Sequence, residues 1–203
     1  MTIRKIENII FDFGGVLVDW NPRYLYKDHF EEYTEMELFL KTVCTDEWNL
    51  EQDRGRALSE GTALLQERFP EYHLLIQLFY DQWEKMLKSD IPETVALLHK
   101  LKAKYKIYGL TNWSAETIPI AYRRFAFFKE FDGIVVSGEE KIIKPDKEIF
   151  HVLINRYHLN ASHSVFIDDN LTNIKAAGEI GLYAIHYKSA VQLEERLRSI
   201  NAI

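Results

Sequence analysis

Short apolar runs recur along the chain, and most are separated by helical patterns. The first run, at 6–12, is rich in branched residues and ends at Gly14-Gly15, which is typical of a buried strand. Similar runs lie at 105–111, 133–136, 165–167 and 182–186. Between or beside these runs, helical patterns occupy 93–104, 115–125, 146–158 and 171–180. This alternation predicts an α/β fold, with a Rossmann-like parallel sheet covered by helices on both faces.

One long segment interrupts the alternation of strands and helices. From Asn21 to about Lys88, apolar residues recur at spacings of three and four, and Asn21-Pro22 is a favourable helix start. We find no alternating strand pattern in this segment. The sequence therefore predicts a core formed by 1–20 and 89–203, and an inserted helical-bundle cap formed by 21–88.

Composition and charge narrow the class of protein. Of the 203 residues, 47% are hydrophobic and 28% are charged, which is typical of a folded globular protein, and the net charge of −6 argues against nucleic-acid binding. No apolar run is long enough to span a membrane, and Glu7 and Asp12 interrupt the only N-terminal candidate for a signal peptide. With Cys44 as its single cysteine, the chain fits a reducing compartment. We expect a cytoplasmic protein that is a monomer or a weak homodimer.

Polar residues with chemical potential follow the predicted strands. They are Asp12, Thr111-Asn112, Lys144 in the loop before Pro145, and Asp168-Asp169. Each has an ordinary explanation when taken alone, as a turn residue, a helix cap or a surface charge. Ligands of parallel sheets, however, bind beyond the carboxyl ends of the strands. We therefore expect these residues to share one cleft.

The charges of this group indicate its ligand. Asp12, Asp168 and Asp169 would repel one another, and Lys144 offsets only part of that repulsion. A divalent cation would relieve it, and an oxygen-rich site suits Mg²⁺. The bound cation would also admit a phosphate dianion, which Thr111, backbone amides near Asn112 and Lys144 could hold.

Four segments, DFGGVL, LTN, KIIKPD and VFIDDNLTN, follow in this order along the chain. They resemble the four motifs of the haloacid dehalogenase-like hydrolase superfamily, and the inserted helices resemble the small helical cap of some members. The resemblance implies a Mg²⁺-dependent phosphatase. It assigns Asp12 as the nucleophile that forms an aspartyl-phosphate, Thr111 and Asn112 as phosphate-binding residues, and Lys144 as both catalytic and phosphate-binding. The implied metal ligands are Asp12, the Gly14 carbonyl and Asp169, with Asp168 acting through water or as a supporting group.

Gly14 departs from the commonest pattern of these phosphatases, which place a second Asp there as general acid and base. Sugar-phosphate phosphatases similar to bacterial alpha-glucose-1-phosphate phosphatase also carry glycine at this position. Asp19 is a candidate replacement, although a turn role is favoured. In the cap, Trp48 and the stretch 51–55 could face the cleft, and Arg54 could bind phosphate or carboxylate; a solvated turn is an equal alternative.

Three functions remain open on the sequence. The first is a Mg²⁺-dependent phosphomonoesterase for a small phosphorylated metabolite, with sugar phosphates as one candidate class. The second is a 2-haloacid dehalogenase, which works without metal and lacks the aspartate pair seen at Asp168-Asp169. The third is a phospho-ligand-binding protein that has lost catalysis through Gly14.

Overall fold

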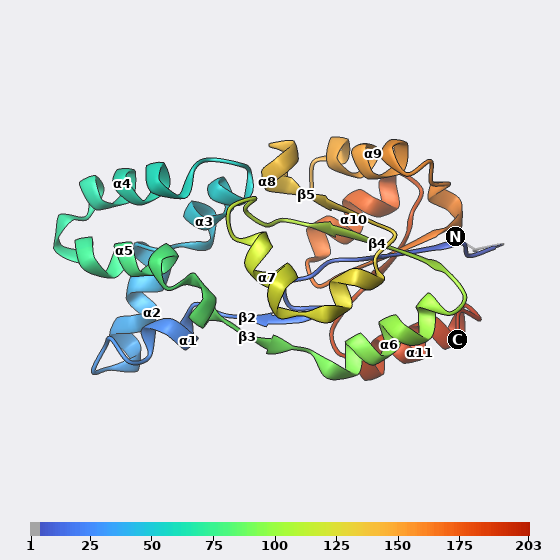
Figure 1. Cartoon of the computed structure of the whole chain (residues 1–203), viewed down its shortest axis with the longest axis horizontal. Coiled ribbons are helices and arrows are strands. Elements are labelled where there is room, and N and C mark those ends of the chain that lie inside the picture. Colours follow the sequence, from blue (N-terminus) through green and yellow to red (C-terminus); the bar gives the residue numbers. More distant parts are fainter. Residues whose placement is uncertain (1–4) are drawn as a thin grey trace.

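The computed structural model describes residues 5–203, and its centre is a five-stranded sheet (Figure 1). The strand order is β5-β4-β1-β6-β7, and each neighbouring pair is parallel. The strands are β1 (Asn8–Phe11), β4 (Lys106–Thr111), β5 (Gly133–Val136), β6 (Ser164–Asp168) and β7 (Tyr183–His186). The predicted α/β class and each predicted run of the sheet are confirmed.

Helices cover both faces of this sheet. Side chains alternate between the two faces along each strand, and buried apolar residues lie on both faces. In β1, Ile9 and Phe11 pack into one core cluster and Ile10 packs into another. Figure 1 shows α9 and α10 over one face, with α6 and α11 over the other. The helices of this part are α6 (Pro92–Lys102), α7 (Ile118–Arg124), α8 (Ser137–Glu140), α9 (Lys147–Arg156), α10 (Leu171–Glu179) and α11 (Ala190–Ser199), with single 3₁₀ segments at η3 (Ala126–Glu130) and η4 (Ala161–His163).

Side-chain caps start two of the helices that follow functional loops. Asp146 accepts a hydrogen bond from the Glu148 backbone N–H at the start of α9, and Asn170 accepts one from Thr172 at the start of α10. The cap at Asn170 directly follows Asp168-Asp169, so the loop that carries these two aspartates is held close to the end of β6.

The long interrupting segment is mostly helical. It contains α1 (Arg23–Tyr26), α2 (Tyr33–Thr42), α3 (Asp46–Asp53), α4 (Leu58–Arg68), η1 (Pro70–Tyr72), α5 (His73–Asp81) and η2 (Trp83–Met86). In Figure 1 these helices lie beyond the end of the sheet opposite the two chain termini, which is the carboxyl end of the strands. The division into a core and a cap remains a prediction. Within residues 5–203, no helix is long and apolar enough to cross a membrane.

A short antiparallel ribbon, missed at the sequence level, flanks the helical segment. It pairs β2 (Val18–Trp20) with β3 (Leu87–Asp90). The expectation that 21–88 holds no strand is therefore wrong at its end, because Leu87 and Lys88 belong to β3. Each strand is only three or four residues long and pairs with a partner far away in sequence, so local alternation gives no usable signal.

Candidate active site

The central strands bring the predicted site residues together at one edge of the sheet. Asp12 follows β1, Thr111 ends β4 and Asp168 ends β6, and these three strands are neighbours in the order β4-β1-β6. The chain leaves β1 toward β4 and leaves β6 toward β7, so the strand order reverses between β1 and β6, which is where open α/β sheets bind their ligands. Asp12 and Asp168 thus meet although they are far apart in sequence.

Lys144 links the two aspartates from the loop before α9. Its Nζ lies 2.9 Å from Asp12 Oδ1 and 2.7 Å from Asp168 Oδ2, and it donates to the Leu110 carbonyl at 2.9 Å. The lysine side chain is only 1% exposed. Burial alone would lower the pKa of its ammonium group, but Asp12 and Asp168 outweigh burial and raise that pKa above its ordinary value. Lys144 is therefore a fixed positive charge in a dry site.

Asp168 is fully engaged in holding this arrangement. Its Oδ1 accepts from the Asn170 backbone N–H at 2.7 Å, and the Asn173 amide donates to both of its oxygens. Its Oδ2 also receives Lys144. With these donors in place, Asp168 orients the lysine and has little lone-pair capacity left for a further direct ligand.

Three carboxylates form a cluster with the spacing of a metal site. One oxygen from each of Asp12, Asp168 and Asp169 lies within 4.8 Å of the others. Burial raises the pKa of Asp12 to about 7, Lys144 opposes that rise and Asp168 adds to it. Burial and then Asp168 also raise the pKa of Asp169. Charges that destabilise one another in this way fit a divalent cation, which would relieve the repulsion.

The sequence model of a protein family described as haloacid dehalogenase-like hydrolase matches residues 6–181. The chain belongs to this family. The predicted family is thereby confirmed, and so is the broad class of hydrolase.

Relatives of this haloacid dehalogenase-like hydrolase have diverse named substrates. A sesquiterpene phosphatase from Aspergillus oryzae is 26% identical over 205 residues, covering 94% of each chain. A phosphorylated carbohydrates phosphatase from Thermotoga maritima is 24% identical over 189 residues, covering 89% of this chain and 84% of the relative. A haloacid dehalogenase family enzyme from Bacteroides thetaiotaomicron has a similar structure, with a TM-score of 0.72, 25% identity, and coverage of 91% and 95% of the two chains. That enzyme has also been crystallised with magnesium and inorganic phosphate.

The loop after β1 brings its backbone close to the hydrolase's acidic cluster. The N–H groups of Val16, Leu17 and Val18 all point to the Phe13 carbonyl, which folds the chain into a tight turn. Gly15 adopts φ +71°, and a Cβ there would lie 2.3 Å from Asp169 Oδ2. Only glycine meets both conditions without displacing the carboxylate.

Thr111 and Asn112 differ in what they offer a ligand. The Thr111 hydroxyl is buried and has no hydrogen-bond partner among residues 5–203, so it is free to donate to a ligand. The Asn112 side chain instead donates to the Lys144 carbonyl at 3.0 Å and accepts from the Lys144 N–H at 2.8 Å. The Asn112 amide thus anchors the loop that carries Lys144, and a phosphate contact from this residue would come from its backbone.

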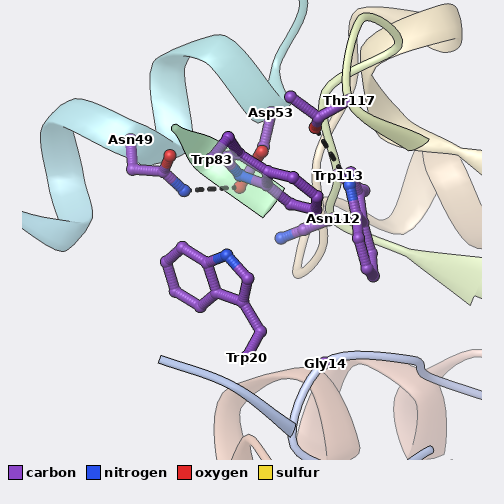
Figure 2. Close-up of a pocket in the computed structure, with 8 residues that line it drawn as sticks. All are labelled: Gly14, Trp20, Asn49, Asp53, Trp83, Asn112, Trp113 and Thr117. Carbon is purple, nitrogen blue, oxygen red and sulfur yellow. Dashed lines mark hydrogen bonds between the residues drawn. The ribbon is translucent and has the colours of Figure 1, made fainter. Parts of the chain in front are cut away.

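A pocket of about 120 Å³ opens beside Gly14 (Figure 2). The segment between β2 and β3 contributes α3 and η2 to it, while the chain after β4 provides the opposite wall. We call it the tryptophan pocket, and its lining residues are Gly14, Trp20, Asn49, Asp53, Trp83, Asn112, Trp113 and Thr117. Sequence reasoning missed its three tryptophans. Asp53 belongs to the stretch 51–55 that was expected to be able to face the cleft, although the ligand-binding role there was given to Arg54.

The other candidates from the sequence do not line this pocket. Arg54 lies 3.5 Å from Glu51 in an exposed ion pair, and Trp48 packs against aromatic rings of α5 while donating to the Gly61 carbonyl. Asp19 accepts a hydrogen bond from the Tyr24 hydroxyl and lies 3.9 Å from Lys88. Asp19 therefore contacts Tyr24 and Lys88 and is not part of the pocket lining, and its role as a replacement acid stays a prediction.

Proposed function

We propose that this hydrolase releases phosphate from small phosphomonoesters in a Mg²⁺-dependent reaction, with Asp12 as the nucleophile. The observation that carries the proposal is the position of Lys144, whose Nζ bonds Asp12 at 2.9 Å and Asp168 at 2.7 Å beside a third carboxylate. With a divalent cation bound in the carboxylate cluster, the buried lysine beside it suits a dianionic ester better than a neutral substrate.

The hydrogen bonds of Asp12 favour one of its oxygens for attack. Oδ1 accepts from the Phe13 N–H at 2.7 Å and from Lys144, whereas Oδ2 has no hydrogen-bond donor among residues 5–203. Oδ2 attacks phosphorus, the ester P–O bond breaks, and the leaving oxygen takes up a proton from solvent water. Water then cleaves the aspartyl-phosphate and restores the carboxylate. Lys144 offsets the charge on the phosphoryl oxygens, and the Thr111 hydroxyl donates to one of them.

The cation would be held by Asp12, Asp169 and the Gly14 carbonyl, with Asp168 acting through water or as a support. The close spacing of the carboxylates supports this assignment, as does the Bacteroides enzyme that was crystallised with magnesium and inorganic phosphate. Bound Mg²⁺ supplies charge neutralisation where carboxylates and phosphate meet. Asp168 already accepts hydrogen bonds from Lys144 and Asn173. We therefore expect Asp12, Asp169 and the Gly14 carbonyl to contact the ion directly.

We propose that segment 21–88 acts as a cap that selects the leaving group. Its residues Asn49, Asp53 and Trp83 line the pocket on the side away from Gly14. Sugar phosphates are one candidate class, in line with the named activity of the Thermotoga relative.

A panel of phosphomonoesters, assayed with Mg²⁺ and with EDTA, tests the proposed function. We expect phosphate release from at least one ester with Mg²⁺ and a loss of at least about 10²-fold when EDTA removes the ion. Halide release from a 2-haloacid in the presence of EDTA would contradict the proposal in favour of a dehalogenase. Thermal stabilisation by phosphate esters without any release would contradict it in favour of a binding protein.

A further inference from the structure

The tryptophan pocket is not used by the chemistry assigned to Asp12, Lys144 and Thr111. Trp83 and Trp113 are almost fully buried, and their rings lie 5.6 Å apart. Trp113 donates its indole N–H to Thr117 at 3.0 Å, so this ring is fixed and its polar atom is satisfied. The cavity of about 120 Å³ is well below the roughly 300–1,000 Å³ typical of drug-sized ligands. It suits a small leaving group held against aromatic faces.

Asp53 is held in this pocket by a chain of hydrogen bonds. Gln52, which is fully buried, donates to the Tyr80 hydroxyl at 2.9 Å, and Tyr80 donates to Asn49 Oδ1 at 3.0 Å. Asn49 Nδ2 then donates to Asp53 Oδ2 at 3.1 Å. Figure 2 shows the last of these bonds, with the Asp53 carboxylate directed toward the space between the indoles. The carboxylate is therefore positioned rather than mobile.

Two polar groups of the pocket, the Trp20 indole N–H and the Asp53 carboxylate, are available to a ligand. The Trp20 indole N–H is buried and has no acceptor among residues 5–203. In Figure 2 its nitrogen lies on the side of the ring that faces Asp53 and Trp83. Burial raises the pKa of Asp53 to about 7, and a hydrogen bond from the Ser114 backbone offsets only part of that rise. The pocket thus offers one unused donor, the Trp20 N–H, and one acceptor, the Asp53 carboxylate, which lines the pocket.

The chemistry of the occupant follows from this pair. An alkyl or prenyl group would bury the Trp20 N–H without an acceptor and would give Asp53 no donor beyond Asn49 and the Ser114 backbone, which is unfavourable. An ammonium group would satisfy Asp53 but leave the Trp20 N–H unpaired. Hydroxyl groups both donate and accept, so they satisfy Asp53 and Trp20 together, while the C–H faces of a carbon skeleton pack on the indole rings.

We propose, on the basis of the phosphatase activity proposed above, that the tryptophan pocket holds the leaving group and selects a hydroxylated one, as in sugar or polyol phosphates. Asp53 accepts a hydrogen bond from a leaving-group hydroxyl, and the Trp20 N–H donates one. Asn49 is a positioning residue that acts through Asp53. The prenyl phosphates suggested by the Aspergillus relative are the opposing substrate class.

The test compares kcat/KM for glucose 6-phosphate, α-glucose 1-phosphate and glycerol 3-phosphate with kcat/KM for farnesyl phosphate, phosphocholine and p-nitrophenyl phosphate, all with Mg²⁺. We expect the wild type to favour at least one hydroxylated ester over farnesyl phosphate and phosphocholine. In Asp53→Asn, the ratio of that ester to p-nitrophenyl phosphate should fall by about tenfold or more. Trp20→Phe, which keeps an aromatic face but removes the N–H, should lower the same ratio by about fivefold or more.

Glu51→Gln is the matched control, because Glu51 is an exposed carboxylate on the same helix and does not line the pocket. It should leave the ratio within about twofold. A preference for farnesyl phosphate, or an equal loss of kcat/KM on every ester in Asp53→Asn, would overturn the inference while leaving the phosphatase proposal intact.

Binding separates the two proposals where turnover is absent. If no ester is hydrolysed, p-nitrophenyl phosphate included, the proposed phosphatase activity is wrong. The pocket assignment then stands only if the hydroxylated esters raise the Tm of the wild type more than inorganic phosphate does, and if Asp53→Asn removes that difference. An equal Tm shift with inorganic phosphate and with these esters would overturn it.

Discussion

At the residue scale, the acidic cluster depends on the absence of a Cβ atom close to its carboxylates. Gly15 is the clearest case, because a Cβ there would lie 2.3 Å from Asp169 Oδ2 and the backbone has φ +71°. A side chain at this position would displace the carboxylate and strain the turn after β1.

We expect Gly15→Ala to lower Mg²⁺ affinity by tenfold or more and the free energy of unfolding by about 1–2 kcal/mol. Titration calorimetry with Mg²⁺ and urea denaturation measure the two effects. Gly178→Ala is the control, since its Cβ meets nothing within 4 Å and the residue lies in α10. Unchanged Mg²⁺ affinity in Gly15→Ala would show that Asp169 is not a ligand.

The sequence predicted the residues of the cluster because each follows a strand end, and the ends of neighbouring parallel strands must meet. Lys144 was also predictable from its loop, and the structure adds its contacts with both aspartates. Trp20 and the role of Asp53 within the stretch 51–55 were not, because both depend on how the helices between β2 and β3 pack over the sheet. No local pattern encodes that packing. The two hydrogen bonds between the Asn112 side chain and the Lys144 backbone could not be predicted from the sequence, because they also depend on tertiary packing.

At the scale of elements, Asp132 joins α6, β4 and the start of β5. Its carboxylate lies 2.7 Å from Lys102 and 3.0 Å from Lys106, and it accepts the Ile107 N–H at 2.8 Å. Burial raises the pKa of this carboxyl, but these three donors together hold it below its ordinary value. The charged form is therefore stabilised by folding.

We expect Asp132→Asn to lower the free energy of unfolding by about 1–2 kcal/mol at neutral pH. Because the pKa is lowered in the folded protein, this contribution is present above the ordinary aspartate pKa of about 3.9 and disappears as the pH falls below it. Urea denaturation at pH 7 and at pH 3 measures the difference, with exposed Asp28→Asn as the control. A deficit that stays constant between the two pH values would contradict the ion-pair account.

Predicted and observed elements agree best where the pattern is long. The helix expected at 146–158 is α9 (Lys147–Arg156), and the strand at 105–111 is β4 (Lys106–Thr111). The sequence did not predict the ribbon of β2 and β3, because its pairing joins segments on either side of the helical insertion. Its register depends on tertiary contacts, which local hydrophobic periodicity does not report.

At the scale of the whole molecule, the sheet positions the acidic cluster with Lys144, and the inserted helices provide one wall of the pocket. Asp12, Lys144, Asp168 and Asp169 come from the sheet side, whereas Asn49, Asp53 and Trp83 come from the insertion. Under the proposed function, chemistry and leaving-group selection therefore belong to different parts of the chain. Substitutions in the insertion should change which ester is used, and substitutions at the sheet edge should change whether any ester is used.

The most direct test of the central claim is the rate of phosphate release by the wild type and by Asp12→Asn, each with Mg²⁺ and with EDTA, on the best ester of the panel. The account predicts release only by the wild type with Mg²⁺, and a drop of at least about 10³-fold in Asp12→Asn while circular dichroism shows an unchanged fold. Phosphate release by Asp12→Asn at the wild-type rate would contradict it.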